Sequence, residues 1–166
     1  MSKRWRIKPG RNLRENARLV VPLMVDDFLS YRERVVTHPR LKQELHRMRL
    51  AGKTLRYAME VFESGFNAEF SLALEEVKLL LETMGQIHDC DVNIPRLQEY
   101  LKEMRLYNRS RDDMQDRLTT SALTALLRTQ SLRRKQLFSE MSTILERWER
   151  ENFVAGLLDS MRSDNL

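Results

Sequence analysis

Apolar residues recur at every third or fourth position along almost the whole chain, and no stretch alternates apolar with polar residues. This spacing places the apolar side chains on one side of an α-helix, whereas a half-buried strand requires strict alternation. Only five of the 166 residues are Gly and four are Pro, so long helices are permitted. We therefore predict an all-α fold, an antiparallel bundle of about five to six helices in a single domain over residues 1–166.

Turn and helix-breaking residues divide this pattern into separate helices. His38-Pro39 and Ser64-Gly65 end the first two, Pro95 suits the first turn of a later helix, and Pro22 is expected to kink the first. The predicted helices cover residues 13–36, 40–63, 68–88, 95–106, a long interrupted stretch beyond residue 108, and 153–161.

The composition predicts a folded cytoplasmic protein. Hydrophobic residues make up 42% of the chain and charged residues 32%, and no apolar run reaches the roughly 18 residues of a membrane span. We see no signal peptide, because no long apolar segment follows the basic N-terminus. Cys90 is the single cysteine, which fits a reducing compartment and a buried thiol.

Positive charge is unevenly distributed. The formal net charge is +5, and residues 1–18 contain seven Lys or Arg and one acid, Glu15. We predict that residues 1–10 form a basic lead-in segment. Such an excess favours anionic partners, although a basic terminus can also act only as a solubilising segment.

A basic stripe is predicted along the second helix. Placing residues 46–60 on a helix at about 100° per residue brings the following polar side chains together: His46, Arg49, Lys53, Arg56 and Tyr57. Like charges at these spacings repel, and within the helix only Glu60 offsets them. The stripe is either a solvated face with scattered ion pairs or an anion site, in which Arg and Lys bind phosphate oxygens while His46 and Tyr57 donate hydrogen bonds.

Two motifs carry a resemblance to a known family. The stretch 45–62, with His46, Arg49, Lys53, Leu55, Arg56, Tyr57 and Phe62 at the matching positions, resembles the signature of the CHAD family, the conserved histidine α-helical domain. The stretch 80–92, with Leu80, Leu81, Met84, Gly85, His88, Asp89, Asp91 and Val92, is similar to the family's second motif.

This resemblance implies an all-helical domain that binds inorganic polyphosphate. It does not imply catalysis by this domain, although relatives are often fused to, or encoded near, triphosphate-processing enzymes. We expect no cofactor and no metal. Arg49, Lys53 and Arg56 are then the main candidate ligands, and His46 and Tyr57 are secondary. Further basic contacts are expected from both ends of the chain, at Lys3, Arg4, Arg11, Arg128 and Lys135.

The sequence contains one copy of the motif, whereas a typical family member has two copies facing each other. Either the second half of the chain is a strongly diverged repeat, or the protein is a single-repeat form. We favour the single-repeat form and hypothesise that a two-fold homodimer supplies the second basic helix.

His88, Asp89 and Asp91 have a structural and a catalytic interpretation. In the structural one, which we favour, His88 packs near a helix end while Asp89 and Asp91 cap the next segment or orient Arg49 or Arg56. In the catalytic one, His88 and Asp89 form the metal pair of an HD-type phosphohydrolase. The remaining ligands would then come from His38, His46, Asp112 or Asp113, although the cations around His46 oppose a metal ion.

A nucleic-acid-binding helical module is the other alternative. A second basic cluster could follow a phosphate backbone, and it consists of Arg128, Arg133, Arg134 and Lys135. We do not favour this alternative, because the sequence shows neither a set of base-stacking aromatic residues nor a helix-turn-helix spacing.

Overall fold

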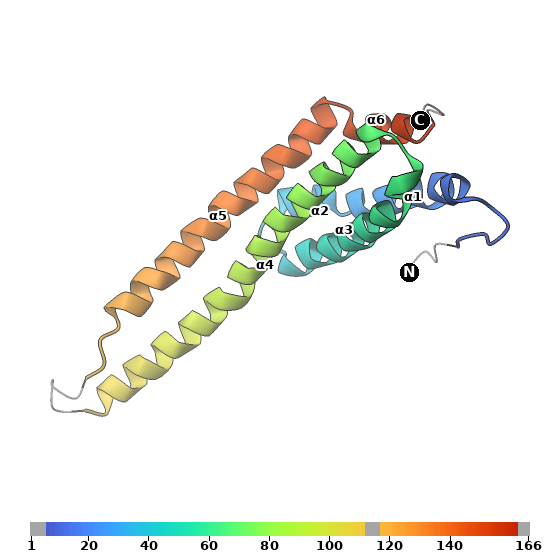
Figure 1. Ribbon diagram of the computed structural model, residues 1–166. Coiled ribbons are helices and arrows are strands. Elements are labelled where there is room, and N and C mark those ends of the chain that lie inside the picture. Colours follow the sequence, from blue (N-terminus) through green and yellow to red (C-terminus); the bar gives the residue numbers. More distant parts are fainter. Residues whose placement is uncertain (1–5, 112–116, 163–166) are drawn as a thin grey trace.

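The computed structural model describes residues 6–111 and 117–162, and within these ranges the chain is helical without any strand. Six α-helices and one short 3-10 helix follow one another (Figure 1). They are α1 (Leu13–Leu29), α2 (Arg32–Thr37), α3 (Lys42–Phe62), η1 (Glu63–Gly65), α4 (Ala68–Arg109), α5 (Ser121–Arg150) and α6 (Phe153–Ser160). The predicted all-α bundle is confirmed.

The first predicted helix is in fact two helices. Pro22 lies inside α1, which continues through it, and the chain instead leaves the helix at Ser30. The Ser30 hydroxyl donates to the carbonyl of Asp27 at 2.7 Å, which is the local hydrogen bonding by which serine competes with helix continuation. The change of direction lets Val35 of α2 reach the core, where it is buried.

The predicted break between residues 88 and 95 is wrong, because α4 runs through Pro95 without interruption. Proline has no backbone N–H, so the carbonyl of Asp91, four residues earlier, loses its helical donor. Lys42 Nζ supplies a replacement donor at 3.4 Å from that oxygen. A contact from another helix thus satisfies the group that proline leaves open.

The bundle is held together by apolar faces that meet in one core. α3 packs between α1 and α4, α5 packs along α4, and α6 closes the end formed by α4 and α5. Fully buried side chains come from all four long helices and include Phe28, Met48, Leu55, Phe70, Leu80, Met84, Met141 and Leu145.

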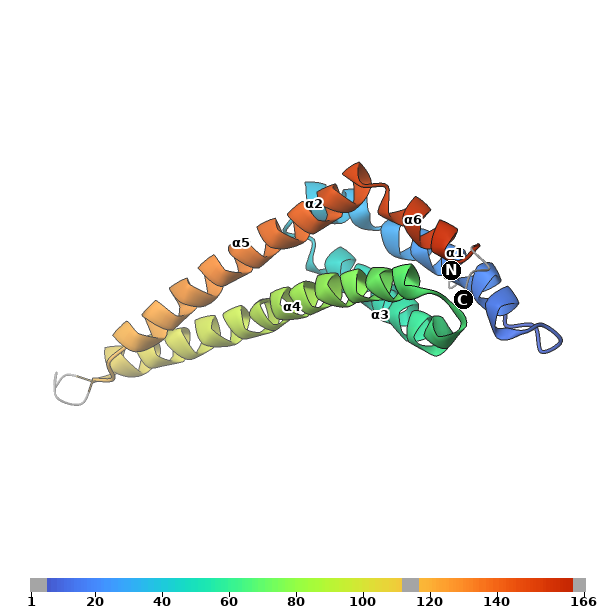
Figure 2. The same ribbon diagram turned by 45° about the horizontal axis from the view of Figure 1, so that its top comes forward.

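The α4 and α5 helices extend well beyond the other helices as an antiparallel pair (Figures 1 and 2). We call this projecting part, residues 96–111 and 117–135, the arm. Between Cys90 and Leu137, Leu101 is the only residue that the structure describes as buried. The arm is therefore a thin two-helix element without the multi-layered core of the bundle.

The start of the described chain packs at the end of the bundle that lies away from the arm. Asn12 caps α1 in a reciprocal arrangement with Glu15, and the buried Asn16 side chain holds the backbone of Lys8 and Arg11. Arg14 Nε donates to the carbonyl of Gly65, just beyond the C-terminal end of α3. No helix in the described ranges is both long enough and apolar enough to cross a membrane.

Candidate anion-binding site

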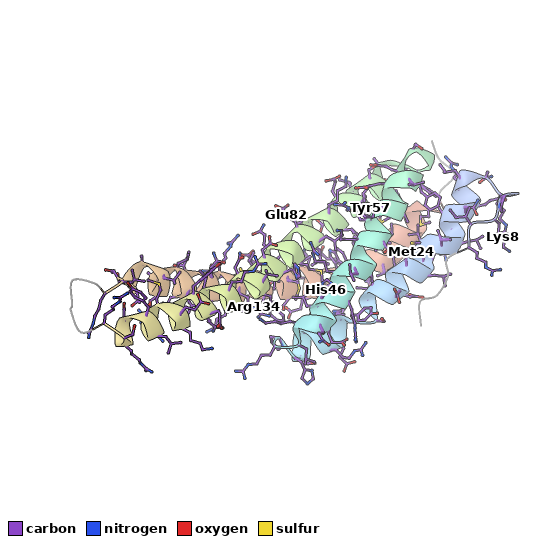
Figure 3. All side chains as sticks on the ribbon, turned by 90° about the horizontal axis from the view of Figure 1, so that it is seen from below. Lys8, Met24, His46, Tyr57, Glu82 and Arg134 are labelled. Atoms are coloured by element: carbon purple, nitrogen blue, oxygen red, sulfur yellow. The ribbon has the colours of Figure 1, made fainter. Side chains whose placement is uncertain are left out.

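The basic stripe lies on α3, directly beside the face that α3 buries. Leu45, Met48, Leu55 and Met59 point into the core at helical spacing. Arg49 lies over Gly85 of α4 and the His46 ring faces His88 of α4, so this part of the stripe lies where α3 meets α4. Tyr57 and His46 follow one another along α3 in Figure 3, with α4 alongside.

A groove of about 510 Å³ opens at the N-terminal half of α3, between that helix and α4. The basic side chains that line it are Lys42, His46, Arg47 and Arg49, all from α3. His88, Asp91 and Val92 line the α4 side. Two of the predicted ligands, His46 and Arg49, therefore lie in one cavity together with two basic residues that were not predicted as ligands.

His46 and His88 face each other across the groove, with 5.4 Å between their ring centroids. His46 is exposed and His88 is half-buried. His88 lies in the middle of α4 rather than near a helix end, so the predicted position was wrong although the side chain does pack against its neighbours. Both imidazoles can donate hydrogen bonds to an anion in the groove.

Arg49 reaches across to α4 at a glycine. A Cβ atom built on Gly85 would lie 3.9 Å from both Nε and Nη2 of Arg49, so the guanidinium rests over bare backbone. Arg49 is half-buried, and its polar edge borders the groove. This arrangement leaves the guanidinium available for bidentate hydrogen bonding to phosphate oxygens.

Lys53, Arg56 and Tyr57 continue the stripe along α3 but do not line the groove. Arg56 Nε lies 3.5 Å from Glu60 Oε1, and its guanidinium lies 4.5 Å from the centre of the Tyr57 ring. Lys53 is half-buried and Tyr57 is half-exposed. The five predicted ligands therefore share one stripe, with the groove at one end of it.

The acids around the stripe pair with cations other than Arg49 and Lys53. Asp91 Oδ1 lies 2.7 Å from Arg134 Nε and 3.3 Å from Lys42 Nζ. Glu44 pairs with Arg47 at 2.7 Å and with Arg34 at 3.5 Å, and Glu60 pairs with Arg56. In the part of the chain that the structure describes, neither Arg49 nor Lys53 has an ion pair or a hydrogen-bond partner.

Asp91 pairs with cations other than those predicted from the sequence. The side chain is only 7% exposed and binds Lys42 and Arg134 rather than Arg49 or Arg56. Asp89 is exposed, and because α4 is continuous neither acid caps a following segment. Asp91 thus fixes a groove cation, Lys42, and joins it to α5.

The additional predicted contacts are scattered. Lys3 and Arg4 lie outside the described residues. Arg11 is exposed in the turn before α1, near the C-terminal end of α3 and thus far from His46. Arg128 and Lys135 are exposed on the α5 side of the arm, and neither lines the groove.

The metal interpretation finds little geometric basis in the described residues. No group of three or more His, Cys, Asp or Glu side chains within residues 6–111 and 117–162 is arranged to hold a metal ion. Asp112 and Asp113 lie outside those residues, and His38 Nδ1 contacts the Thr37 hydroxyl at 2.8 Å. Cys90 is buried, and that burial raises the pKa of its thiol, which keeps it protonated near neutral pH.

Lys42 and Arg47 line the groove although we did not single them out as ligands from the sequence, and Arg134, which was named only in the second basic cluster, joins the site through Asp91. Lys42 stands four residues before His46, so the spacing of the stripe already included it. The Arg134–Asp91 pair joins residues 43 positions apart on different helices. No local pattern reveals such a contact.

Comparison with known families matches the part of the chain that contains the basic stripe and the groove. The model of the CHAD domain family matches residues 7–98, which is more than half of the chain and includes α1 to α3 and the first part of α4. Searches of curated proteins and of solved structures gave no match.

Proposed function

The chain belongs to the CHAD-domain family, and we propose that it binds inorganic polyphosphate, without catalysing a reaction, through the basic stripe of α3. The ligand would enter the groove between α3 and α4 and continue along the stripe. Arg49 and Lys53 would be the main contacts, supported by His46, Arg56 and Tyr57.

The observation that supports this proposal most strongly is the unpaired state of Arg49 and Lys53 within the described residues. Both are half-buried, and a desolvated charge without a partner costs free energy. They also lie four residues apart on one helix, where like charges repel. A bound polyanion removes both penalties at once.

The groove supplies complementary chemistry for phosphate. Arg49 offers a planar set of N–H donors and Lys42 adds a point charge in the groove, while Lys53 adds another farther along the stripe. His46 and His88 can donate hydrogen bonds to phosphate oxygens. Asp91, which also lines the groove, limits the movement of Lys42 by pairing with it.

A charge-reversal variant tests the site. Arg49→Glu with Lys53→Glu should weaken polyphosphate binding more than about 100-fold, since two charge-assisted contacts become repulsive. The matched control is Arg150→Glu with Arg162→Glu, which changes the net charge equally at exposed positions away from the groove. Binding is measured by isothermal titration, and far-UV circular dichroism checks that helicity is retained.

If the groove variant binds as tightly as the unmodified protein, the site is misplaced. If groove and control variants lose affinity equally, only the net charge matters, and the specific groove is ruled out. A competition assay at fixed salt compares long polyphosphate with ATP and single-stranded nucleic acid. Preference for nucleic acid would favour the nucleic-acid module, and release of phosphate would indicate an enzyme.

We also propose that the protein forms a two-fold homodimer. The sequence holds a single copy of the His46 motif, so a second protomer would provide the facing basic helix. Sedimentation velocity at micromolar concentration should give a dimer, with or without polyphosphate. A strict monomer under both conditions would contradict this part of the proposal while leaving the α3 site intact.

A further inference from the structure

The arm is strongly basic. Its described residues include ten Lys or Arg and two Glu. Asp112, Asp113 and Asp116, which lie outside the described residues, lower the formal charge of residues 96–135 to +5, the same as that of the whole chain. The rest of the chain therefore has no net charge, and the arm is a concentrated source of positive potential.

Few of the arm cations are neutralised by the protein itself. Within the described ranges, Lys102 pairs with Glu99 at 3.5 Å and Arg134 pairs with Asp91 at 2.7 Å. No other arm cation has a carboxylate partner among the described residues. Arg105 and Arg109 in particular are exposed and unpaired there. A surface of this kind attracts anions and is not explained by intramolecular ion pairing.

Three of the arm cations on α4 lie on the same side of that helix as the groove residue Asp91. Lys102, Arg105 and Arg109 lie 11, 14 and 18 residues after Asp91, close to whole turns, so all three share its side of the helix. Asp91 in turn holds Lys42 of the groove and Arg134 of α5. Figure 3 shows Arg134 on the arm side of His46.

The combined basic surface is long. From Gly85, which faces Arg49, to Arg109, α4 advances about 36 Å at about 1.5 Å per residue. The continuity of α4 through Pro95 keeps the two parts on one rigid element. A small phosphate compound can occupy only the groove, whereas a long chain can contact both parts.

We propose that the arm is a second binding surface for the same polyanion, and that a long polyphosphate chain held in the groove continues past Lys42 and Arg134 onto Arg105 and Arg109. This inference rests on the proposed function and specifies its ligand as a long chain rather than an oligophosphate. Each added phosphate contact releases counterions and increases affinity.

Polyphosphate fits the arm better than single-stranded nucleic acid does. Proteins that bind nucleic acid strands stack bases on a series of open aromatic faces. The described part of the arm has only two aromatic residues, Tyr100 and Tyr107, which is too few for a stacking series, and the Arg111 guanidinium lies 4.8 Å from the centre of the Tyr107 ring and covers one face of it. The charges, by contrast, need no stacking surface to bind a chain of phosphates.

The test measures affinity against chain length. Arg105→Gln with Arg109→Gln should weaken the binding of polyphosphate that is several times longer than the surface by about 5- to 30-fold. The same variant should bind tripolyphosphate as the unmodified protein does. Arg150→Gln with Arg162→Gln is the matched control and should bind both ligands normally.

Each other outcome overturns the inference. Unchanged affinity of the arm variant for long chains excludes the arm, and equal losses for short and long chains indicate a general charge effect. If the arm variant loses affinity for a single-stranded RNA of matched length but not for polyphosphate, the arm binds nucleic acid instead. An unmodified protein that binds tripolyphosphate but gains no affinity with chain length contradicts the inference alone, whereas absence of polyphosphate binding at any length contradicts the proposed function.

Discussion

At Gly52, α3 packs closely against α1 and α4. A Cβ atom built there would lie 2.7 Å from Leu81 Cδ2 and 2.8 Å from Phe28 Cε2. Phe28 is fully buried and packs edge-on against Trp148, with 6.4 Å between ring centroids, so its ring has little room to move. The missing side chain thus lets α3 pack closely on α1 and α4. Arg49 precedes Gly52 along α3 and Lys53 follows it.

We expect Gly52→Ala to lower the free energy of unfolding by up to about 2 kcal/mol. Alanine gains about 1 kcal/mol of helix propensity, but overpacking a well-filled core typically costs about 1 to 3 kcal/mol. Urea denaturation followed by circular dichroism measures the change. A more stable variant would mean that Phe28 and Leu81 can move aside easily.

Among the helices, α4 depends on a contact that lies outside it. Pro95 removes one helical hydrogen bond, and Lys42 donates to the carbonyl of Asp91 in its place. The same lysine forms an ion pair with the Asp91 carboxylate. The carbonyl that Pro95 leaves without a helical donor therefore helps to hold Lys42, a groove cation, in place.

Pro95→Ala should raise the free energy of unfolding by about 1 to 3 kcal/mol, because alanine restores the backbone donor and removes the helix penalty of proline. The midpoint of urea unfolding should rise with an unchanged slope. Lys42 keeps its carboxylate partner, so short-chain polyphosphate binding should change little. Lower stability would show that α4 is adapted to the proline.

For single helices, the features that depend on neighbouring residues in the sequence, such as helix ends and helix faces, could be predicted from the sequence. His38-Pro39 and Ser64-Gly65 placed the ends of α3 within two residues, and its spacing predicted which side carries Arg49 and Lys53. The break before Pro95 was predicted wrongly because the compensating donor, Lys42, lies 49 residues from Asp91. The groove was not predictable for the same reason, since it forms where two helices meet.

For the whole molecule, the structure combines a compact bundle with a basic arm. The bundle supplies the core that positions α3 against α4, and the groove lies where the arm emerges from it. Affinity for a polyanion should therefore depend on both local contacts and overall charge. These two contributions respond differently to salt, since counterion release scales with the number of phosphates contacted.

The salt dependence of polyphosphate binding tests the central claim most directly. The measurement compares the unmodified protein with Arg49→Gln and Lys53→Gln combined, using tripolyphosphate so that the arm contributes nothing. If both side chains contact phosphate, affinity should fall and the slope of log K against log salt should become shallower, because two charge contacts are lost. An unchanged slope and affinity would show that the α3 stripe does not hold the ligand.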